Sequence, residues 1–303
     1  MTETRPDRFF NGIVPRTLYR CWRPYRTFVF AGLIFLLLVL PPVSGAREVD
    51  VAVPGTMAVY GDTRGNPDIH RKIVEGILKF NPRVVFHVGD LVQRGAGQKE
   101  WADFKEIIAP LTGKAEFFPV RGNHDAGSSH YFDTFTLPGN ERWYSVERYG
   151  VHFILLDTNS RLTPGSDQYR WLEAELQRVG RKDKFVAVVL HHSPFSTGIY
   201  PDEKRLKKKI VPLFEKYAVD IVFSGHNHFY ERQRVRDVTY IVTGGGGDPL
   251  HFKFRYSPDS QVFANVHHFC IFHVAGDELV LEAYDVDLNP IDQFRIRKRK
   301  QGK

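Results

Sequence analysis

Apolar residues follow two recurring patterns along most of this chain. Short continuous runs of Val, Ile, Phe and Leu are typical of strands that are buried on both faces. Stretches with helical periodicity separate these runs. In the stretch 66–80, Ile69, Ile73 and Ile77 recur on one face and Pro67 suits the first turn. Strands that alternate with helices predict a layered α/β fold.

The same two patterns continue along residues 47–303, which we call the body of the chain. The runs expected as strands are 57–60, 83–88, 116–120, 151–156, 185–190, 220–223 and 240–242. Helices are expected at 66–80, 100–108, 168–179 and 204–217. Three further strands, expected to form an antiparallel meander, are 269–274, 279–285 and 291–296. The stretch 128–149 is typical of a loop-rich insertion, and because no linker or repeat divides the body, we expect one domain at 47–303.

Residues 1–46 form a separate segment of a different kind. The stretch 27–46 carries no charge, and its apolar part, 28–40, has the length of a signal-peptide core rather than of a full membrane span. Six Arg precede it, which predicts a cytoplasmic head. Small residues at 44–46 suit cleavage after Ala46, but an uncleaved membrane anchor stays open; a buried core helix is disfavoured because no polar face exists. Both favoured readings predict an extracytoplasmic body, membrane-anchored, or periplasmic or secreted if cleaved.

Composition and charge limit the classes of partner that the chain is expected to bind. The net charge is +7, but residues 1–46 hold six Arg against two acidic residues, which leaves only +3 for the rest, so no nucleic-acid binding is indicated. The body has a single cysteine, Cys270, so it has no internal disulfide and Cys270 is expected to be a small buried residue. The basic stretch 204–209 is expected to be a solvated helix face rather than a contact with anionic lipid.

Nearly every predicted strand of the body ends in Asp, Asn or His. In open α/β sheets, ligands bind outside the carboxyl ends of the strands, so residues scattered in sequence should converge there. Such a mixture of oxygen and imidazole donors suits two divalent transition-metal ions such as Mn, Fe, Zn, Co or Ni, rather than Ca. The candidate ligands are Asp62, Asp90, Asn123, His192, His226 and His228.

The sequence Asn123-His124-Asp125 follows one of these strands and offers catalytic chemistry. His124 can act as an acid or base near neutral pH, and Asp125 can orient its ring. Taken alone, this stretch could also form an Asx-type turn, which is the less favoured alternative. The four glycines at 244–247 can either approach a substrate closely or simply turn the backbone, and the sequence leaves both open.

The ordered set of motifs resembles the calcineurin-like metallophosphoesterase superfamily. The motifs stand here as "GDTRG", "GDLVQRG", "RGNHD", "VLHHSP" and "SGHNH", and the match runs over about 60–228. The stretches "WYSVERYGVHFILLDT", "QYRWLEAEL" and "TGGGG" are similar to the branch around the purple acid phosphatases. The resemblance implies a four-layer α/β/β/α sandwich that hydrolyses a phosphate ester with a metal-activated hydroxide at a dinuclear site.

The resemblance also implies roles for the individual residues. Asp90 would bridge two metals, and His124 would contact the substrate and protonate the leaving oxygen, with Asp125 behind it. The "HSP" alignment makes His192 a ligand, although a register slip of one residue would exchange it for His191. The other ligands would be Asp62 and His228 at the first metal, and Asn123 and His226 with His192 at the second.

The chain departs from the family pattern at the first metal. The family usually has Asp-x-His there, and here Arg64 takes the place of that His; Gln93 stands where purple acid phosphatases have a metal-binding Tyr. Arg64 is therefore expected to contact the phosphate, or alternatively to point into solvent. A catalytically weak phosphate-binding protein is the alternative function. The physiological substrate, monoester or diester, the metal and the oligomeric state stay open.

Overall fold

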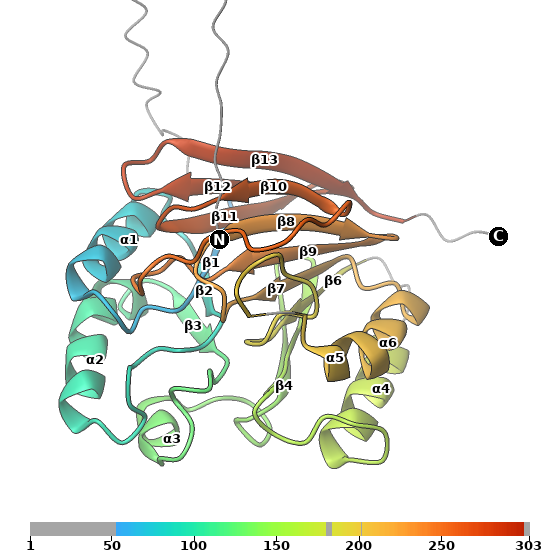
Figure 1. Cartoon of the computed structure of the whole chain (residues 1–303), viewed down its shortest axis with the longest axis horizontal. Coiled ribbons are helices and arrows are strands. Elements are labelled where there is room, and N and C mark those ends of the chain that lie inside the picture. The colour runs from blue at the N-terminus through green and yellow to red at the C-terminus, as the bar shows by residue number, and fades with distance from the viewer. Residues whose placement is uncertain (1–52, 180–183, 201, 300–303) are drawn as a thin grey trace, which may run out of the picture. The chain divides into compact units, whose positions relative to one another are not determined.

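The computed structural model describes residues 53–179, 184–200 and 202–299, all of which belong to one compact unit (Figure 1). The predicted signal or anchor segment at 1–46 lies outside the described residues. Within the described ranges, no helix is long and apolar enough to cross a membrane.

Two β-sheets form the centre of the unit. The first has six strands in the order β13-β12-β11-β1-β2-β3, and the second has seven in the order β10-β8-β9-β7-β6-β5-β4. The strands of the first sheet are β1 (Met57–Tyr60), β2 (Val84–His87), β3 (Glu116–Pro119), β11 (His268–Ala275), β12 (Glu278–Asp285) and β13 (Pro290–Arg297). Those of the second are β4 (Tyr144–Arg148), β5 (Val151–Leu155), β6 (Phe185–Val189), β7 (Ile221–Ser224), β8 (Tyr230–Val235), β9 (Val238–Thr243) and β10 (Ser260–Ala264).

Helices cover the outer faces of both sheets (Figure 1). Those beside the first sheet are α1 (Pro67–Lys79) and α2 (Gln98–Thr112), and those beside the second are α4 (Asp167–Val179), α5 (Lys204–Lys209) and α6 (Val211–Lys216). The period of two along a strand explains the layers. In β1, Met57 and Val59 face the core between the sheets, whereas Ala58 and Tyr60 pack under the helices. The predicted α/β/β/α layering is therefore confirmed for the described residues.

Several elements differ from the expectation, each for a local reason. The helix expected at 204–217 is two helices that meet at Ile210, next to Pro212, which has no backbone N–H to continue the ladder. The insertion at 128–149 contains a short helix, α3 (His130–Thr134), and the edge strand β4. Strand β8 was missed because its sequence is polar, although Glu231 is fully buried and bonded to Thr197.

The predicted C-terminal meander is confirmed, since β11, β12 and β13 pair antiparallel. Strands β1, β2 and β3 are parallel, as are β5, β6, β7 and β9. The carboxyl ends of these parallel strands therefore carry their loops to one common edge, between the two sheets, where the candidate residues lie.

Candidate metal centre

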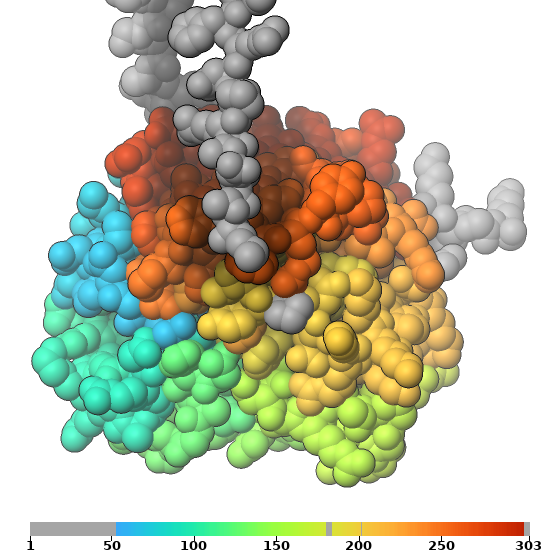
Figure 2. Space-filling view, viewed as in Figure 1, coloured from blue at the N-terminus to red at the C-terminus, as the bar shows by residue number. Residues whose placement is uncertain are grey.

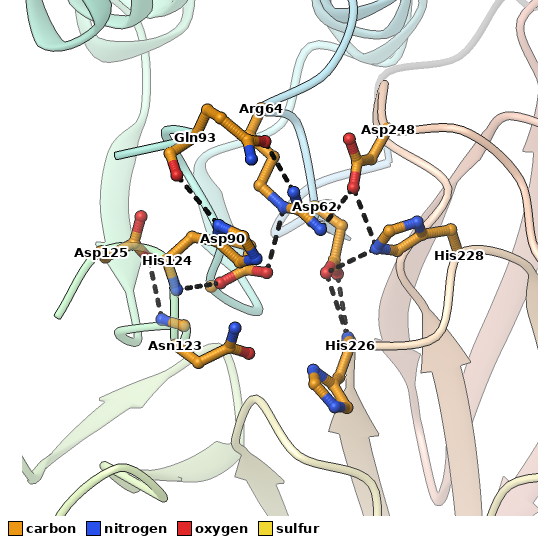
Figure 3. A network of polar contacts seen from close by, with 12 residues as sticks. Asp62, Arg64, Asp90, Gln93, Asn123, His124, Asp125, His226, His228 and Asp248 are labelled. Carbon is orange, nitrogen blue, oxygen red and sulfur yellow. Dashed lines mark hydrogen bonds and ion pairs between the residues drawn. The ribbon is translucent and has the colours of Figure 1, made fainter. Parts of the chain in front are cut away.

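Five loops bring the predicted site residues together and a sixth loop joins them, and Figure 3 labels the predicted residues other than His192. Asp62 follows β1, Asp90 follows β2, and the segment 123–125 follows β3. In the second sheet, His191 and His192 follow β6, and the segment 226–228 follows β7. The sixth loop follows β9 and carries Asp248, which the sequence reading did not include.

The backbone is strained at three of these positions. Asp62, Asp90 and His226 have φ values of 57°, 55° and 69°. Side chains other than Gly rarely adopt this left-handed region, and such residues cluster at functional sites. Hydrogen bonds hold the conformation: the His226 N–H donates to both oxygens of Asp62, at 3.1 and 3.2 Å. Gly122 is required beside them, because a Cβ at that position would overlap the Asp90 carboxylate.

One side of the centre, which we name the second half-site, contains Asn123, His191, His192 and His226, with Asp90 shared. His191 is fully buried, and its Nδ1 lies 2.9 Å from the Val88 carbonyl oxygen. A carbonyl can only accept, so Nδ1 carries the proton and Nε2 keeps a lone pair. That Nε2 faces Asn123 Oδ1 at 3.0 Å and Asp90 Oδ1 at 3.5 Å. These convergent lone pairs fit a bound cation.

His192 and His226 complete this half-site on its outer side. One nitrogen from each of His191, His192 and His226 lies within 4.8 Å of the others. His192 Nδ1 is 2.7 Å from the Thr158 hydroxyl, which can donate or accept, so this contact does not fix the tautomer. The lone pair of His191 is thus oriented by its surroundings, whereas that of His192 is not.

The second half-site opens into a cavity of about 330 Å³. His192, His226 and Tyr200 contribute to its lining, and the Tyr200 ring lies 4.3 Å from that of His226. The loop after β6 and the loop after β9 meet beside it, since the Phe254 N–H donates to the Thr197 carbonyl at 2.7 Å. Figure 2 shows these yellow and orange segments next to one another on the surface.

The other side, which we name the first half-site, contains Asp62, His228, Asp248 and Arg64, again with Asp90 shared. His228 Nδ1 lies 2.8 Å from the Pro249 carbonyl, so Nδ1 carries a proton. Its Nε2 is buried without a hydrogen-bond partner, at 3.5 Å from Asp62 Oδ1 and 3.2 Å from Asp248 Oδ2. An unpartnered nitrogen between two carboxylates also fits a cation.

Arg64 points into the first half-site and not into solvent, and its side chain is only 12% exposed. Its Nε lies 3.2 Å from Asp90 Oδ2, and its Nη2 lies 2.5 Å from Asp248 Oδ2. Nη1 donates to Gln93 Oε1 at 2.6 Å. The guanidinium is thus held among the carboxylates where the family pattern places an imidazole (Figure 3).

Asp125 and His124 are positioned differently from the sequence expectation. The Asp125 carboxylate accepts the backbone N–H groups of Leu91, Val92 and Gly122, which ties the loops after β2 and β3 together. The His124 ring instead has its Nδ1 2.9 Å from the Gln93 carbonyl oxygen. A backbone carbonyl, rather than Asp125, therefore orients this imidazole.

Burial disfavours the charged form of the titratable groups on both sides of the centre. Burial, together with the neighbouring His191 and His192, lowers the pKa of His226 to about 2, so its ring is neutral. Burial raises the pKa of Asp62 to about 7, although the adjacent His228 opposes this shift. The second half-site therefore presents neutral imidazoles, whereas in the first half-site Arg64 pairs with the carboxyl groups of Asp90 and Asp248.

The sequence did not lead us to expect two residues of the centre, Asp248 and His251. Asp248 directly follows the four glycines at 244–247, so an acidic residue after a glycine-rich strand end was the available signal. His251 stacks on His228 with ring centroids 3.8 Å apart, and its Nδ1 accepts the His228 N–H at 3.1 Å. No pattern in the sequence pointed to His251, because it belongs to an irregular loop.

Comparison with known proteins agrees with this geometry. The family model described as calcineurin-like phosphoesterase matches residues 55–230, which is more than half of the chain. The chain belongs to the calcineurin-like phosphoesterase family. The predicted resemblance, including its purple acid phosphatase-like branch, is therefore confirmed.

Curated relatives that are more than 30% identical to the chain agree with this family. It is 31% identical over 240 residues to the probable purple acid phosphatase 20 of Arabidopsis thaliana, covering 69% of this chain and 56% of the relative. It is 38% identical over 238 residues to the Fe(3+)-Zn(2+) purple acid phosphatase 12 of the same plant, covering 70% and 49%. The chain thus spans about half the length of the curated relatives it matches.

The fold is also that of a solved plant purple acid phosphatase. The yellow lupin protein PPD1 aligns with a TM-score of 0.72 at 20% identity, covering 80% of this chain and 53% of the lupin chain. At this identity, the alignment bears on the fold and not on the activity. It agrees with the two-sheet architecture described above.

Proposed function

We propose that this chain hydrolyses phosphate esters with the help of two divalent transition-metal cations. The observation that carries the proposal is the pair of buried imidazoles, His191 and His228, whose Nδ1–H groups donate to backbone carbonyls. Each Nε2 is thereby directed at oxygen ligands from Asp62, Asp90 or Asn123. The relatives named as purple acid phosphatases, one of them as an Fe(3+)-Zn(2+) enzyme, support the same chemistry.

The residues divide into two ligand sets that share Asp90. At the second half-site we assign Asn123, His226 and, in place of the expected His192, its neighbour His191, because only His191 has a lone pair fixed toward Asp90 and Asn123. At the first half-site we assign Asp62 and His228. Bound divalent cations would lower the pKa of a water nucleophile and neutralise phosphoryl oxygens.

The remaining chemistry comes from side chains of the chain itself. His124 is held through its Nδ1–H by the Gln93 carbonyl, so its doubly protonated ring can give the Nε2 proton to the leaving oxygen. The Arg64 guanidinium, at the edge of the site, can stabilise charge on phosphate oxygens with its paired N–H groups. Asp125 keeps the loops of Asp90 and His124 in register through its three backbone hydrogen bonds.

The cavity beside His226 gives the ester a place for its organic group. Its volume of about 330 Å³ is at the lower end of small-molecule sites. Its lining combines the rings of Tyr200 and His192 with Asp202, Glu203 and Lys204. An aromatic and polar lining of this kind suits a small, polar organic group rather than a long acyl chain.

A phosphate-binding protein with little turnover is the second candidate, and one observation favours it. Arg64 already forms ion pairs with Asp90 and Asp248 in the first half-site. If that half-site never took up a cation, phosphate could bind without efficient hydrolysis. The two candidates differ in turnover and not in the fold.

A direct test combines metal content with substrate hydrolysis. The full chain, stripped with chelator and reloaded with Mn²⁺, Zn²⁺ or Fe, is assayed with p-nitrophenyl phosphate and bis(p-nitrophenyl) phosphate. The proposal expects hydrolysis that returns with metal and saturates at two equivalents. Metal and phosphate binding with no hydrolysis of either ester would support the binding protein instead.

We further propose an extracytoplasmic location for the folded body. The support is the Arg-rich head and uncharged stretch within 1–46. A reporter enzyme that folds only outside the cytoplasm, fused after Lys303, should be active. The same reporter fused to residues 47–303 alone should be inactive, and equal activity of both fusions would refute the assignment.

A further inference from the structure

The two positions where the chain departs from the family pattern are in direct contact. Arg64 Nη1 donates to Gln93 Oε1 at 2.6 Å, and the same guanidinium reaches Asp248 Oδ2 at 2.5 Å. Its Nε lies 3.2 Å from Asp90 Oδ2. Three donors of one side chain thus have three separate partners on two loops, since Asp90 and Gln93 both follow β2 and Asp248 follows β9. Arg64, Gln93 and Asp248 form one unit, which we name the guanidinium clamp.

The clamp uses the oxygens that a first-site cation would need. Asp90 directs Oδ1 toward the second half-site, where it lies 3.5 Å from His191 Nε2. Its other oxygen, Oδ2, is the one that contacts Arg64. Likewise, Asp248 Oδ2 faces both Arg64 and the unpartnered Nε2 of His228, at 3.2 Å. A positive guanidinium at these two atoms also repels a second cation placed there.

Asp248 is held firmly in this position by its surroundings. Its backbone N–H donates to the Asp62 carbonyl at 3.0 Å, and its residue is only 4% exposed. A Cβ at Gly65 would overlap the Asp248 carboxylate, so that neighbour must be glycine for Asp248 to lie here. The carboxylate is therefore a fixed part of the first half-site and not a mobile surface group.

We propose that Asp248 is an additional ligand of the first-site cation, and that Arg64 competes with this cation for Asp248 Oδ2 and Asp90 Oδ2. The inference rests on the proposed metal centre. The second half-site fills first, because Arg64 contacts Asp90 Oδ2 and not the Oδ1 that faces this half-site. The first fills only when Arg64 releases the two carboxylates, and the released guanidinium is then free to contact the phosphate. The clamp thereby sets the order and the affinities of cation binding.

The test measures Mn²⁺ binding, independently of activity, by calorimetric titration of the metal-stripped full chain. The native chain should bind one equivalent tightly and a second at least about tenfold more weakly. Arg64→Gln removes the positive charge and should tighten the weaker site by at least about tenfold, while the tighter site changes less than about twofold. A gain in affinity cannot arise from misfolding, so this variant is informative even if it is less stable.

Asp248 is tested in the same background. Adding Asp248→Asn to Arg64→Gln should reverse the gain at the weaker site, because the ligand oxygen is lost. Matched controls are Arg71→Gln on α1, which pairs with Glu106 on the surface, and Asp103→Asn on α2, which pairs with Lys99. Neither control should alter either affinity.

The possible outcomes separate this inference from the proposed function. Two binding events in the native chain that Arg64→Gln leaves unchanged would overturn the competition and leave the metal centre standing. A gain that survives Asp248→Asn would overturn the ligand role of Asp248. Absence of Mn²⁺ binding in the native chain and all variants would overturn the metal centre itself.

Discussion

The two half-sites are built on the same strand ends of one fold, yet they differ in charge. The second half-site gathers neutral imidazoles around Asn123, and the Val88 carbonyl fixes the lone pair of His191. The first half-site places the Arg64 guanidinium between Asp90 and Asp248, and His228 lies beside Asp62. The fold therefore places ligands in both, but the balance of charge decides how readily each accepts a cation.

The difference also shows how a departure from a family pattern can be compensated locally. Arg64 cannot ligate a metal, since it has no lone pair to offer. The structure surrounds it with Asp90, Gln93 and Asp248, so that a buried charge is paired and hydrogen-bonded. An arginine in this position is thus tolerated because an acidic residue from a distant loop lies beside it.

The largest effect is expected where the half-sites join. Asp90→Asn removes the charge shared by both cations, and phosphatase activity should fall at least about a thousandfold, on the scale of losing the electrostatic core of a site. Steady-state hydrolysis of p-nitrophenyl phosphate in excess Mn²⁺ measures this. Asp103→Asn, on the exposed face of α2, is the matched control. Near-normal turnover of metal-replete Asp90→Asn would contradict the proposal that both cations share Asp90.

His124 should affect the chemistry without affecting either half-site. His124→Ala should lower turnover of alkyl phosphates by roughly a hundredfold or more, because the leaving oxygen then has no proton donor. The loss should be smaller with nitrophenyl phosphate, whose leaving group needs no proton. Mn²⁺ titration should give native affinities at both half-sites. If alkyl and nitrophenyl esters lost the same factor, the acid role would have to be abandoned.

The adjacent residues His191 and His192 are expected to contribute unequally to cation binding at the second half-site. His191→Ala should weaken the tighter Mn²⁺ equivalent by roughly a hundredfold, because its fixed lone pair is lost, on the scale of the effects that tune metal affinity. His192→Ala should weaken it by less than about tenfold. Calorimetry of both variants makes the comparison within one loop. A larger loss for His192→Ala would restore the sequence-based choice of ligand.

The smallest effect concerns how the free energy of unfolding depends on pH. This dependence has to be known before the two half-sites are compared at low pH. Burial lowers the pKa of His70 from 6.5 to about 3, and its Nε2 lies 3.3 Å from the Tyr60 hydroxyl. The unfolded chain therefore binds the proton more readily than the folded one. The contribution of His70 to the free energy of unfolding is complete above pH 6.5. It decreases as the pH falls toward 3, by up to about 1.4 kcal/mol per pH unit.

His70→Gln, which does not titrate, should have a flatter dependence of stability on pH in that range. Urea unfolding of the metal-free protein at pH 7 and pH 5 measures the slope. Identical slopes for His70→Gln and the native chain would show that His70 is not protonated on unfolding in this range.

The sequence alone determined the main architecture. Continuous apolar runs such as those in β1 and β6 are typical of strands buried on both faces and implied a layered α/β fold, and the family resemblance implied the second sheet. The polar residue after each run implied a common edge. Strand β8, with Glu231 and Arg232, was missed because its buried polar groups find partners only in the folded protein.

The tertiary structure decided two features that hydrophobic periodicity does not predict. Whether His191 or His192 faces Asp90 depends on one residue of register at the end of β6, and the Val88 carbonyl of another strand end selects it. Whether Arg64 pointed outward or inward depended on Asp248, which lies 184 residues later in the chain (248 − 64). Hydrogen bonds and charge pairs between distant loops leave no periodic signal, because they act through space and not along the sequence.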